Sequence, residues 1–168
     1  MTGLLSIDQR LLECVIEGTR SGLQMAGVDP PPVGASRFYA THRDISVLVG
    51  LCGGSNGTMT LNISEKGMLY LTSKLLFEEQ EGPSEENFDA ICEIGNMVGG
   101  CIKEALAESD YDVENISVPS LILGANYNVF YTRGIETVSV EFELEEIPAT
   151  FQRDRFFSAT VSLLRQVA

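Results

Sequence analysis

Two stretches with helical periodicity, each followed by a run of strand-like segments, constrain the fold of this 168-residue chain more than any other feature. The first, 8–24, repeats apolar residues at helical spacing and is stopped by three consecutive prolines, Pro30 to Pro32. The second, 85–108, is longer. Helices followed by several strands, rather than alternating with single strands, are typical of the α+β class.

The remaining segments complete two similar halves. Asn56-Gly57 is a strong hairpin signal between two strand-like stretches. We predict strands at about 33–41, 45–52, 57–64, 112–123, 126–133 and 136–145, and further helices at 64–77 and 151–166, with an acidic loop at 78–86. The chain should therefore form one domain over 1–168. We expect an antiparallel sheet of about six strands and two long helices, related by a pseudo-twofold axis.

The charge balance excludes two classes of partner. The chain has 24 Asp and Glu against 11 Lys and Arg, a formal net charge of −13. Nucleic acids and anionic membranes both require a basic surface, so we expect neither as the main partner. A partner protein with a local basic patch or an exposed Lys remains compatible with this charge.

The cysteines and the single histidine, His42, predict no metal site. No Cys-x-x-Cys pair exists among the four cysteines, which are Cys14, Cys52, Cys92 and Cys101. We interpret all four as buried, reduced thiols. The first residues show no basic segment followed by an apolar stretch, and no apolar run approaches the roughly 20 residues of a membrane span. We therefore expect a cytoplasmic protein.

Two weaker motifs have simpler explanations. Cys52 could act as a nucleophile on a turn, but only one histidine is available to activate it. The glycine-rich run 50–57 lacks the Lys-Ser or Lys-Thr pair of a phosphate-binding loop. A hairpin turn explains both features.

The helix predicted at 85–108 carries a polar stripe opposite its apolar face. Asp89, Glu93 and Asn96 are spaced i, i+4 and i+7, which places them within about 60° of one another around the helix. Gly100 continues the stripe and leaves room for an approaching surface, whereas Gly95 and Gly99 lie toward the buried flank. Such a stripe alone is more often just a solvated helix face.

The spacing of four residues changes that interpretation. Asp89, Glu93 and Asn96 are followed, after 22 residues, by Pro119, which comes after the strand-like Ile116-Ser117-Val118. This pattern resembles the motif of the CheC/CheX/FliY chemotaxis phosphatases: Asp or Ser, three residues, Glu, two residues, Asn, 22 residues, Pro. The predicted order of elements is also similar to that family over about residues 5–150.

The resemblance implies a phosphatase that hydrolyses the aspartyl phosphate of a CheY-type response regulator. It implies that Asn96 enters the regulator's site and orients a water, and that Glu93 pairs with the regulator's Lys. Asp89, Pro119 and Gly100 would support the motif. The regulator would supply Mg²⁺, so no cofactor of the chain's own is expected. CheX-like members of the family form homodimers, and we expect a homodimer here.

The first half of the chain contains only a weak match to the motif. Ser6, Gln9 and Pro32 repeat the Glu, Asn and Pro spacings at a shift of 87 residues. One intact motif makes the chain more similar to CheX than to two-site CheC. Two other functions remain open: a noncatalytic module that docks a regulator or a flagellar switch protein, and a scaffold without a regulator partner.

Overall fold

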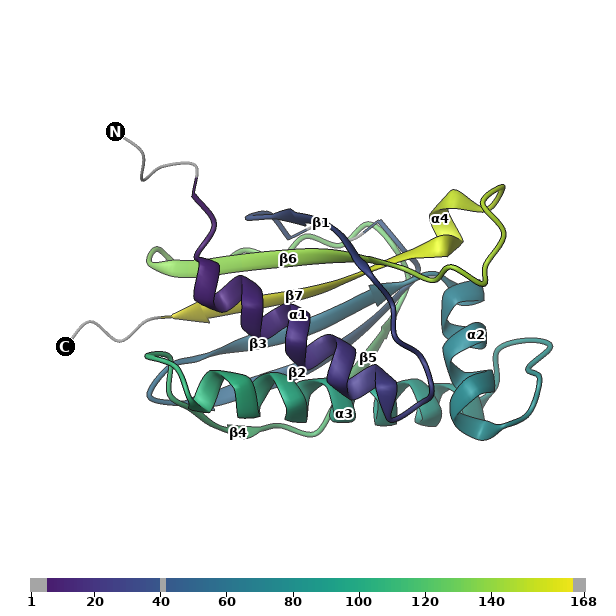
Figure 1. The fold of residues 1–168 in the computed structure, drawn as a ribbon, viewed down its shortest axis with the longest axis horizontal. Coiled ribbons are helices and arrows are strands. Elements are labelled where there is room, and N and C mark those ends of the chain that lie inside the picture. The colour runs from purple at the N-terminus through teal and green to yellow at the C-terminus, as the bar shows by residue number, and fades with distance from the viewer. Residues whose placement is uncertain (1–5, 40–41, 165–168) are drawn as a thin grey trace.

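The computed structural model describes residues 6–39 and 42–164, which form an antiparallel sheet with helices on one face and at one end (Figure 1). The helices are α1 (Gln9–Gln24), α2 (Glu65–Leu76), α3 (Glu85–Ala107) and α4 (Gln152–Arg155). The strands are β1 (Pro32–Ser36), β2 (Ile45–Gly53), β3 (Asn56–Ile63), β4 (Val113–Ile116), β5 (Ser120–Leu123), β6 (Ile135–Glu143) and β7 (Phe156–Leu164). The α+β class, the antiparallel sheet and the two long helices are confirmed.

The strand order shows the two similar halves. The seven strands follow the order β1-β6-β7-β3-β2-β4, with β5 also paired to β2. Exchanging α1 with α3, β1 with β4 and β5, β2 with β6, and β3 with β7 returns the same order read backwards. The pseudo-twofold axis therefore passes between the central strands β3 and β7, which come from different halves of the chain.

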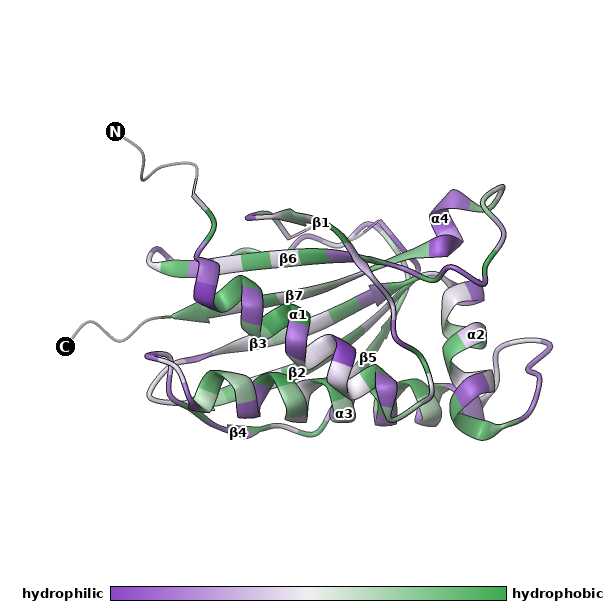
Figure 2. Cartoon of the chain, in the orientation of Figure 1, coloured by the Kyte–Doolittle hydropathy of each residue, from purple (hydrophilic) through white to green (hydrophobic). Residues whose placement is uncertain are grey.

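The core lies between the sheet and the two long helices. Strand residues alternate in polarity, and hydrophobic and hydrophilic bands follow one another along β6 in Figure 2. The inward residues of β7, such as Phe157 and Val161, are at most 1% exposed and meet Ile94 and Ile102 of α3 in one buried cluster. Burying this apolar surface is the main force that holds the layers together.

Two glycines let α1 and α3 pack closely. A Cβ atom at Gly18 would lie 2.6 Å from Cα of Ile102, and one at Gly22 would lie 2.6 Å from Cα of Val98. The later glycine of α1 thus meets the earlier residue of α3, so the two helices run antiparallel (Figure 1). This contact fixes the position of α3, whose opposite side carries the polar stripe.

The start of α3 is held by a polar network. The Oγ atom of Ser84 caps the helix by accepting from the backbone N–H of Asn87 at 3.3 Å. The Asn87 side chain is fully buried and donates to Oε1 of Gln80 at 2.8 Å. The acidic loop before α3 is thereby tied to the helix, so that Glu85 and Glu86 fall in the first turn, where the helix dipole favours negative charge.

Two predicted elements were wrong. Instead of a helix over 151–166, the chain forms the four-residue α4 and then β7, the described part of that stretch ending at residue 164. The residues from Phe157 to Leu163 alternate between apolar and Ser or Thr, which is the period of a strand. The predicted strand 126–133 is irregular, and its Tyr127 hydroxyl instead lies 3.0 Å from that of Tyr39.

Two other strands have different limits. The predicted strand 112–123 is divided into β4 and β5, with Pro119 in the break. Of the predicted strand 33–41, the structure places β1 at Pro32–Ser36, while residues 40 and 41 lie outside the described part.

The prediction that all four thiols are buried was also wrong. Cys14 is buried, Cys92 and Cys101 are half-buried, and Cys52 is exposed; none forms a disulfide. Cys52 follows the inward-facing Leu51 on β2, so its side chain lies on the other face of the strand. Cys92 and Cys101 lie on the flanks of α3, between its buried and exposed faces.

Candidate functional site

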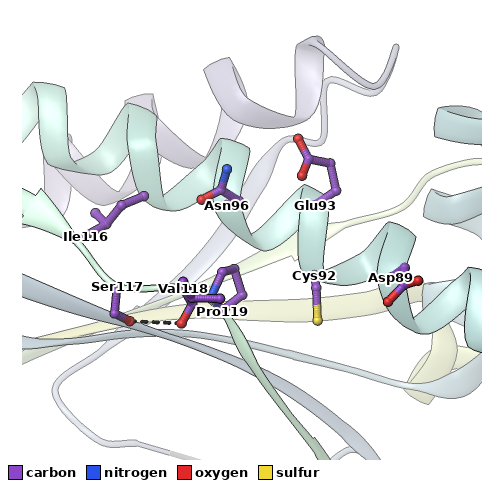
Figure 3. Close-up of a pocket in the computed structure, with 8 residues that line it drawn as sticks. All are labelled: Asp89, Cys92, Glu93, Asn96, Ile116, Ser117, Val118 and Pro119. Carbon is purple, nitrogen blue, oxygen red and sulfur yellow. Dashed lines mark hydrogen bonds between the residues drawn. The ribbon is translucent and has the colours of Figure 1, made fainter.

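The polar stripe of α3 forms one wall of a surface groove of about 560 Å³. Asp89, Glu93 and Asn96 are all exposed on the helix, as the sequence predicts. The groove is lined by these three residues together with Cys92, Ile116, Ser117, Val118 and Pro119. Figure 3 shows the helix residues on one side and the 116–119 segment on the other.

The second wall is a bulge between β4 and β5. Leu51 of β2 pairs with Ile116 and Leu48 pairs with Ser120, so two residues of β2 face three residues of the neighbouring segment. The extra residue pushes the backbone at Val118 and Pro119 out of the ladder, while the backbone N–H of Ser117 still bonds to β2. Val118 is 85% exposed at this point, and Pro119 has no N–H to offer the ladder. The bulge therefore presents an apolar surface toward the acidic helix face.

The glycines of α3 serve the two faces of the helix differently. A Cβ atom at Gly95 would lie 2.5 Å from Cγ1 of Val47 on β2, and one at Gly99 would lie 3.2 Å from Cγ1 of Val49. These two glycines let the helix lie close to the sheet. Gly100 has no atom within 4 Å of such a Cβ position, so it leaves open space beside the stripe, as predicted.

Neither the thiol nor the hydroxyl in the groove is an activated nucleophile. Burial raises the pKa of the Cys92 thiol, and the neighbouring Asp89 carboxylate raises this pKa further, so the thiol is protonated at neutral pH. The Ser117 hydroxyl is bonded to backbone groups rather than to a base. Besides these two groups, the groove offers two carboxylates and a neutral amide, which can position a reactant through charge and hydrogen bonds.

No metal centre is found within residues 6–39 and 42–164, where no three His, Cys, Asp or Glu side chains gather at ligand spacing. Over the same residues, no helix is both long and apolar enough to span a bilayer.

The four residues of the sequence motif are brought together at one place. Pro119 comes to the groove although it is 23 positions beyond Asn96, because β4 and β5 run back beside α3. Sequence reasoning missed Cys92, Ile116, Ser117 and Val118 as groove residues. Cys92 lies on α3 beside the polar stripe, and the place of the other three depends on the register with β2. Of the weaker first-half match, Ser6 precedes α1, Gln9 begins it and Pro32 begins β1; none of them lines this groove.

Solved structures share this architecture. A CheC-like superfamily protein from Shewanella sp. PV-4 is 20% identical with a TM-score of 0.75, covering 94% of this chain and 99% of its own. CheX from Desulfovibrio desulfuricans is 20% identical with a TM-score of 0.74, covering 91% of this chain and 98% of its own. CheX from Borrelia burgdorferi, solved with CheY, BeF₃ and Mg²⁺, is 23% identical with a TM-score of 0.72, covering 94% and 99%.

These likenesses define the class of the molecule as a CheC-like α+β fold. The family model of the chemotaxis phosphatase CheX matches residues 45–143, which is more than half of the chain, and the chain therefore belongs to that family. Among curated proteins, none matches the chain significantly.

Proposed function

We propose that the chain is a phosphatase that hydrolyses the aspartyl phosphate of a CheY-type response regulator. The observation that carries this proposal is the gathering of Asp89, Glu93, Asn96 and Pro119 around one exposed groove. Membership of the CheX family supports the activity. The partner is suggested by the related CheX that was solved with CheY, BeF₃ and Mg²⁺.

Asn96 is proposed to orient the attacking water. In the reaction, the water oxygen bonds to phosphorus, the bond from phosphorus to the aspartyl oxygen breaks, and the products are inorganic phosphate and a free carboxylate. A neutral amide can accept a hydrogen bond from the water and donate one to a phosphoryl oxygen without repelling its charge. Phosphoryl transfer depends mainly on positioning and charge stabilisation, so an exposed amide on a rigid helix suits the task.

Glu93 is proposed to set the register of the complex. It lies one turn before Asn96 on the same exposed face, which supports a pairing of its carboxylate with the regulator's Lys. Asp89 lies a further turn back and adds negative charge at the edge of the interface. The Mg²⁺ that neutralises phosphoryl charge belongs to the regulator in this scheme, and Glu93 and Asn96 would contact the regulator's protein groups and the water.

The activity is tested with response regulators charged by acetyl phosphate. Phosphate loss is followed with and without the wild-type chain, and then with Asn96→Ala. We expect wild type to accelerate the loss and Asn96→Ala to lower turnover at saturation by about a hundredfold or more, as for other losses of reactant positioning. The matched control is Asn128→Ala, another exposed asparagine that does not line the groove.

The fold should survive the change in Asn96. The side chain is exposed, so removing it opens no cavity, and its effect on the free energy of unfolding should stay within about 0.5 kcal/mol. Wild-type turnover by Asn96→Ala would contradict the water-orienting role. If the wild type binds a charged regulator without accelerating phosphate loss, a noncatalytic docking module is the better description.

A further inference from the structure

We propose that Ser117 is a positioning residue: its hydroxyl holds the Val118–Pro119 wall of the groove in the shape that binds the regulator. This inference rests on the proposed function, because it concerns how the same groove recognises its partner. Ser117 is not one of the four residues of the sequence motif. Its importance follows from the hydrogen bonds that it makes in the bulge.

The Ser117 hydroxyl joins two backbone groups that the bulge separates. Its Oγ accepts from the backbone N–H of Gly50 at 2.7 Å and donates to the carbonyl oxygen of Val118 at 3.0 Å. The backbone N–H of Ser117 also donates to the carbonyl oxygen of Gly50 at 2.9 Å. The dashed line in Figure 3 marks the bond from Ser117 to Val118.

The hydroxyl therefore replaces a lost bond of the ladder. In a regular antiparallel pair, the N–H and C=O groups of Gly50 would both bond to the backbone of the neighbouring strand. Here the extra residue moves one carbonyl out of reach, and the side chain of Ser117 takes its place as acceptor. Without the hydroxyl, neither the Gly50 N–H nor the Val118 carbonyl keeps this partner, and the bulge can change shape.

Gly50 makes this arrangement possible. A Cβ atom there would lie 3.1 Å from Oγ and 3.2 Å from Cβ of Ser117, so a side chain would press against the hydroxyl. Gly50 and Ser117 thus form a matched pair at the base of the wall. The wall itself ends in Val118, an apolar side chain that is 85% exposed beside the groove.

Loss of the hydroxyl should weaken binding without slowing the chemical step. The wall belongs to the bulge, whereas Asn96 is held by α3, which packs on the sheet through Gly95 and Gly99. A bulge that samples several shapes must be ordered again when the regulator binds, which lowers the apparent affinity. Once the complex has formed, Asn96 is placed as in the wild type.

The experiment compares Ser117→Ala with Ser117→Thr, which keeps a hydroxyl, and with Ser120→Ala. Ser120 is also exposed but does not line the groove. Affinity is measured for a regulator charged with beryllofluoride and Mg²⁺, and turnover is measured with the phosphorylated regulator. We expect Ser117→Ala to raise Kd and KM about fivefold, the effect of one hydrogen bond, with kcat within about twofold of wild type. Ser117→Thr should restore most of the affinity, and Ser120→Ala should match wild type.

The split between KM and kcat separates positioning from stability. A variant that is only partly folded loses active molecules, which lowers the apparent kcat and leaves KM unchanged. Wild-type Kd and KM in Ser117→Ala, or a loss in kcat alone, would overturn the inference while leaving the proposed phosphatase intact. A wild-type chain that neither binds nor dephosphorylates the regulators would overturn both.

The hydrogen bond itself can be tested in the free protein. Amide hydrogen exchange at Gly50 should be slow in wild type and in Ser117→Thr, and faster in Ser117→Ala, because the Ser117 hydroxyl is the acceptor for that N–H. Unchanged protection of the Gly50 amide in Ser117→Ala would overturn the inference, whatever the activity measurements give.

Discussion

Glu93 and Asn96 lie one turn apart on α3, yet the proposed reaction gives them different tasks. Both side chains are exposed, so neither contributes to the core. The amide acts on the water, and its loss should be seen in turnover. The carboxylate acts on a cation of the partner, and its loss should be seen in association.

We predict that Glu93→Ala weakens binding of the charged regulator by about tenfold, or about 1.4 kcal/mol. Glu93→Lys should weaken binding further, because it sets two cations against each other. Titrations at two salt concentrations measure this effect, and the difference from wild type should shrink as salt screens the pair. Glu104→Ala is the control, since Glu104 is exposed on the same helix but lies away from the groove. Equal affinity of Glu93→Ala and wild type would remove Glu93 from the interface.

At the scale of the element, α3 combines a face that touches the sheet with a face that is open. Gly95 is buried on the first face, where Cγ1 of Val47 already occupies the space that a Cβ atom would need. Gly100 is on the second face, where that space is empty. The same substitution should therefore have opposite effects at the two positions.

We predict that Gly95→Ala lowers the free energy of unfolding by about 1–3 kcal/mol, because a methyl group is forced into a packed contact. Gly100→Ala should raise it by up to about 1 kcal/mol, because alanine favours the helix and meets no neighbour. Urea unfolding of the two variants measures both changes. If the partner uses the open space at Gly100, the stabilised variant should also bind the charged regulator less tightly. Destabilisation by Gly100→Ala would contradict the account of an open face.

The helices and the helical part of the site could be predicted because they depend on local spacing. The i, i+4 and i+7 positions of Asp89, Glu93 and Asn96 place them on one face of α3 wherever the helix packs. The bulge could not be derived in the same way, because the place of Ser117 and Val118 depends on a pairing with β2 that is more than 60 residues away. Pro119 was found through its motif and only then given a structural reason.

The missed strand β7 had a local signal that was read as the wrong period. Its apolar residues, from Phe157 to Leu163, occur at every second position, with Ser or Thr between them. The segment 126–133 was predicted as a strand because tyrosine and valine favour strands in general, but the structure forms no strand there. The hydroxyl of Tyr131 lies 3.3 Å from Oγ1 of Thr58. The ring of Tyr39 contacts the rings of both Tyr127 and Tyr131. Tertiary contacts decide the conformation of this stretch.

At the scale of the whole molecule, the two edges of the sheet differ. One edge, formed by β4 and β5, is interrupted by the bulge at the groove, and such irregularities hinder pairing with another strand. The other edge is β1, which pairs in regular register with β6 from Gly34 to Ser36 and has one irregularity at Val33, a residue that is 49% exposed. An unpaired strand of this kind offers backbone groups through which a sheet can continue into a second copy.

We therefore predict a homodimer that forms through β1. Light scattering at two protein concentrations should give the mass of two chains, and Val33→Lys should shift the population toward the monomer, because a charged lysine at the edge opposes pairing. Ile122→Lys on the opposite edge is the control; Ile122 is half-buried on β5. A monomeric wild type at both concentrations would rule out this assembly.

The central position of β7 has a consequence for how the chain reaches its folded state. β7 follows every other strand in the sequence, yet it lies between β3 and β6 and pairs with both along its length. Its register with β3 joins Asn56 to Leu164 and Asn62 to Ser158, contacts between residues about a hundred positions apart. During synthesis, β3 and β6 must each wait with one side unpaired until β7 leaves the ribosome. Contacts of such long range slow folding, and β3, which is complete at Ile63, keeps an open sheet edge until β7 is made, so we expect the nascent chain to need chaperones.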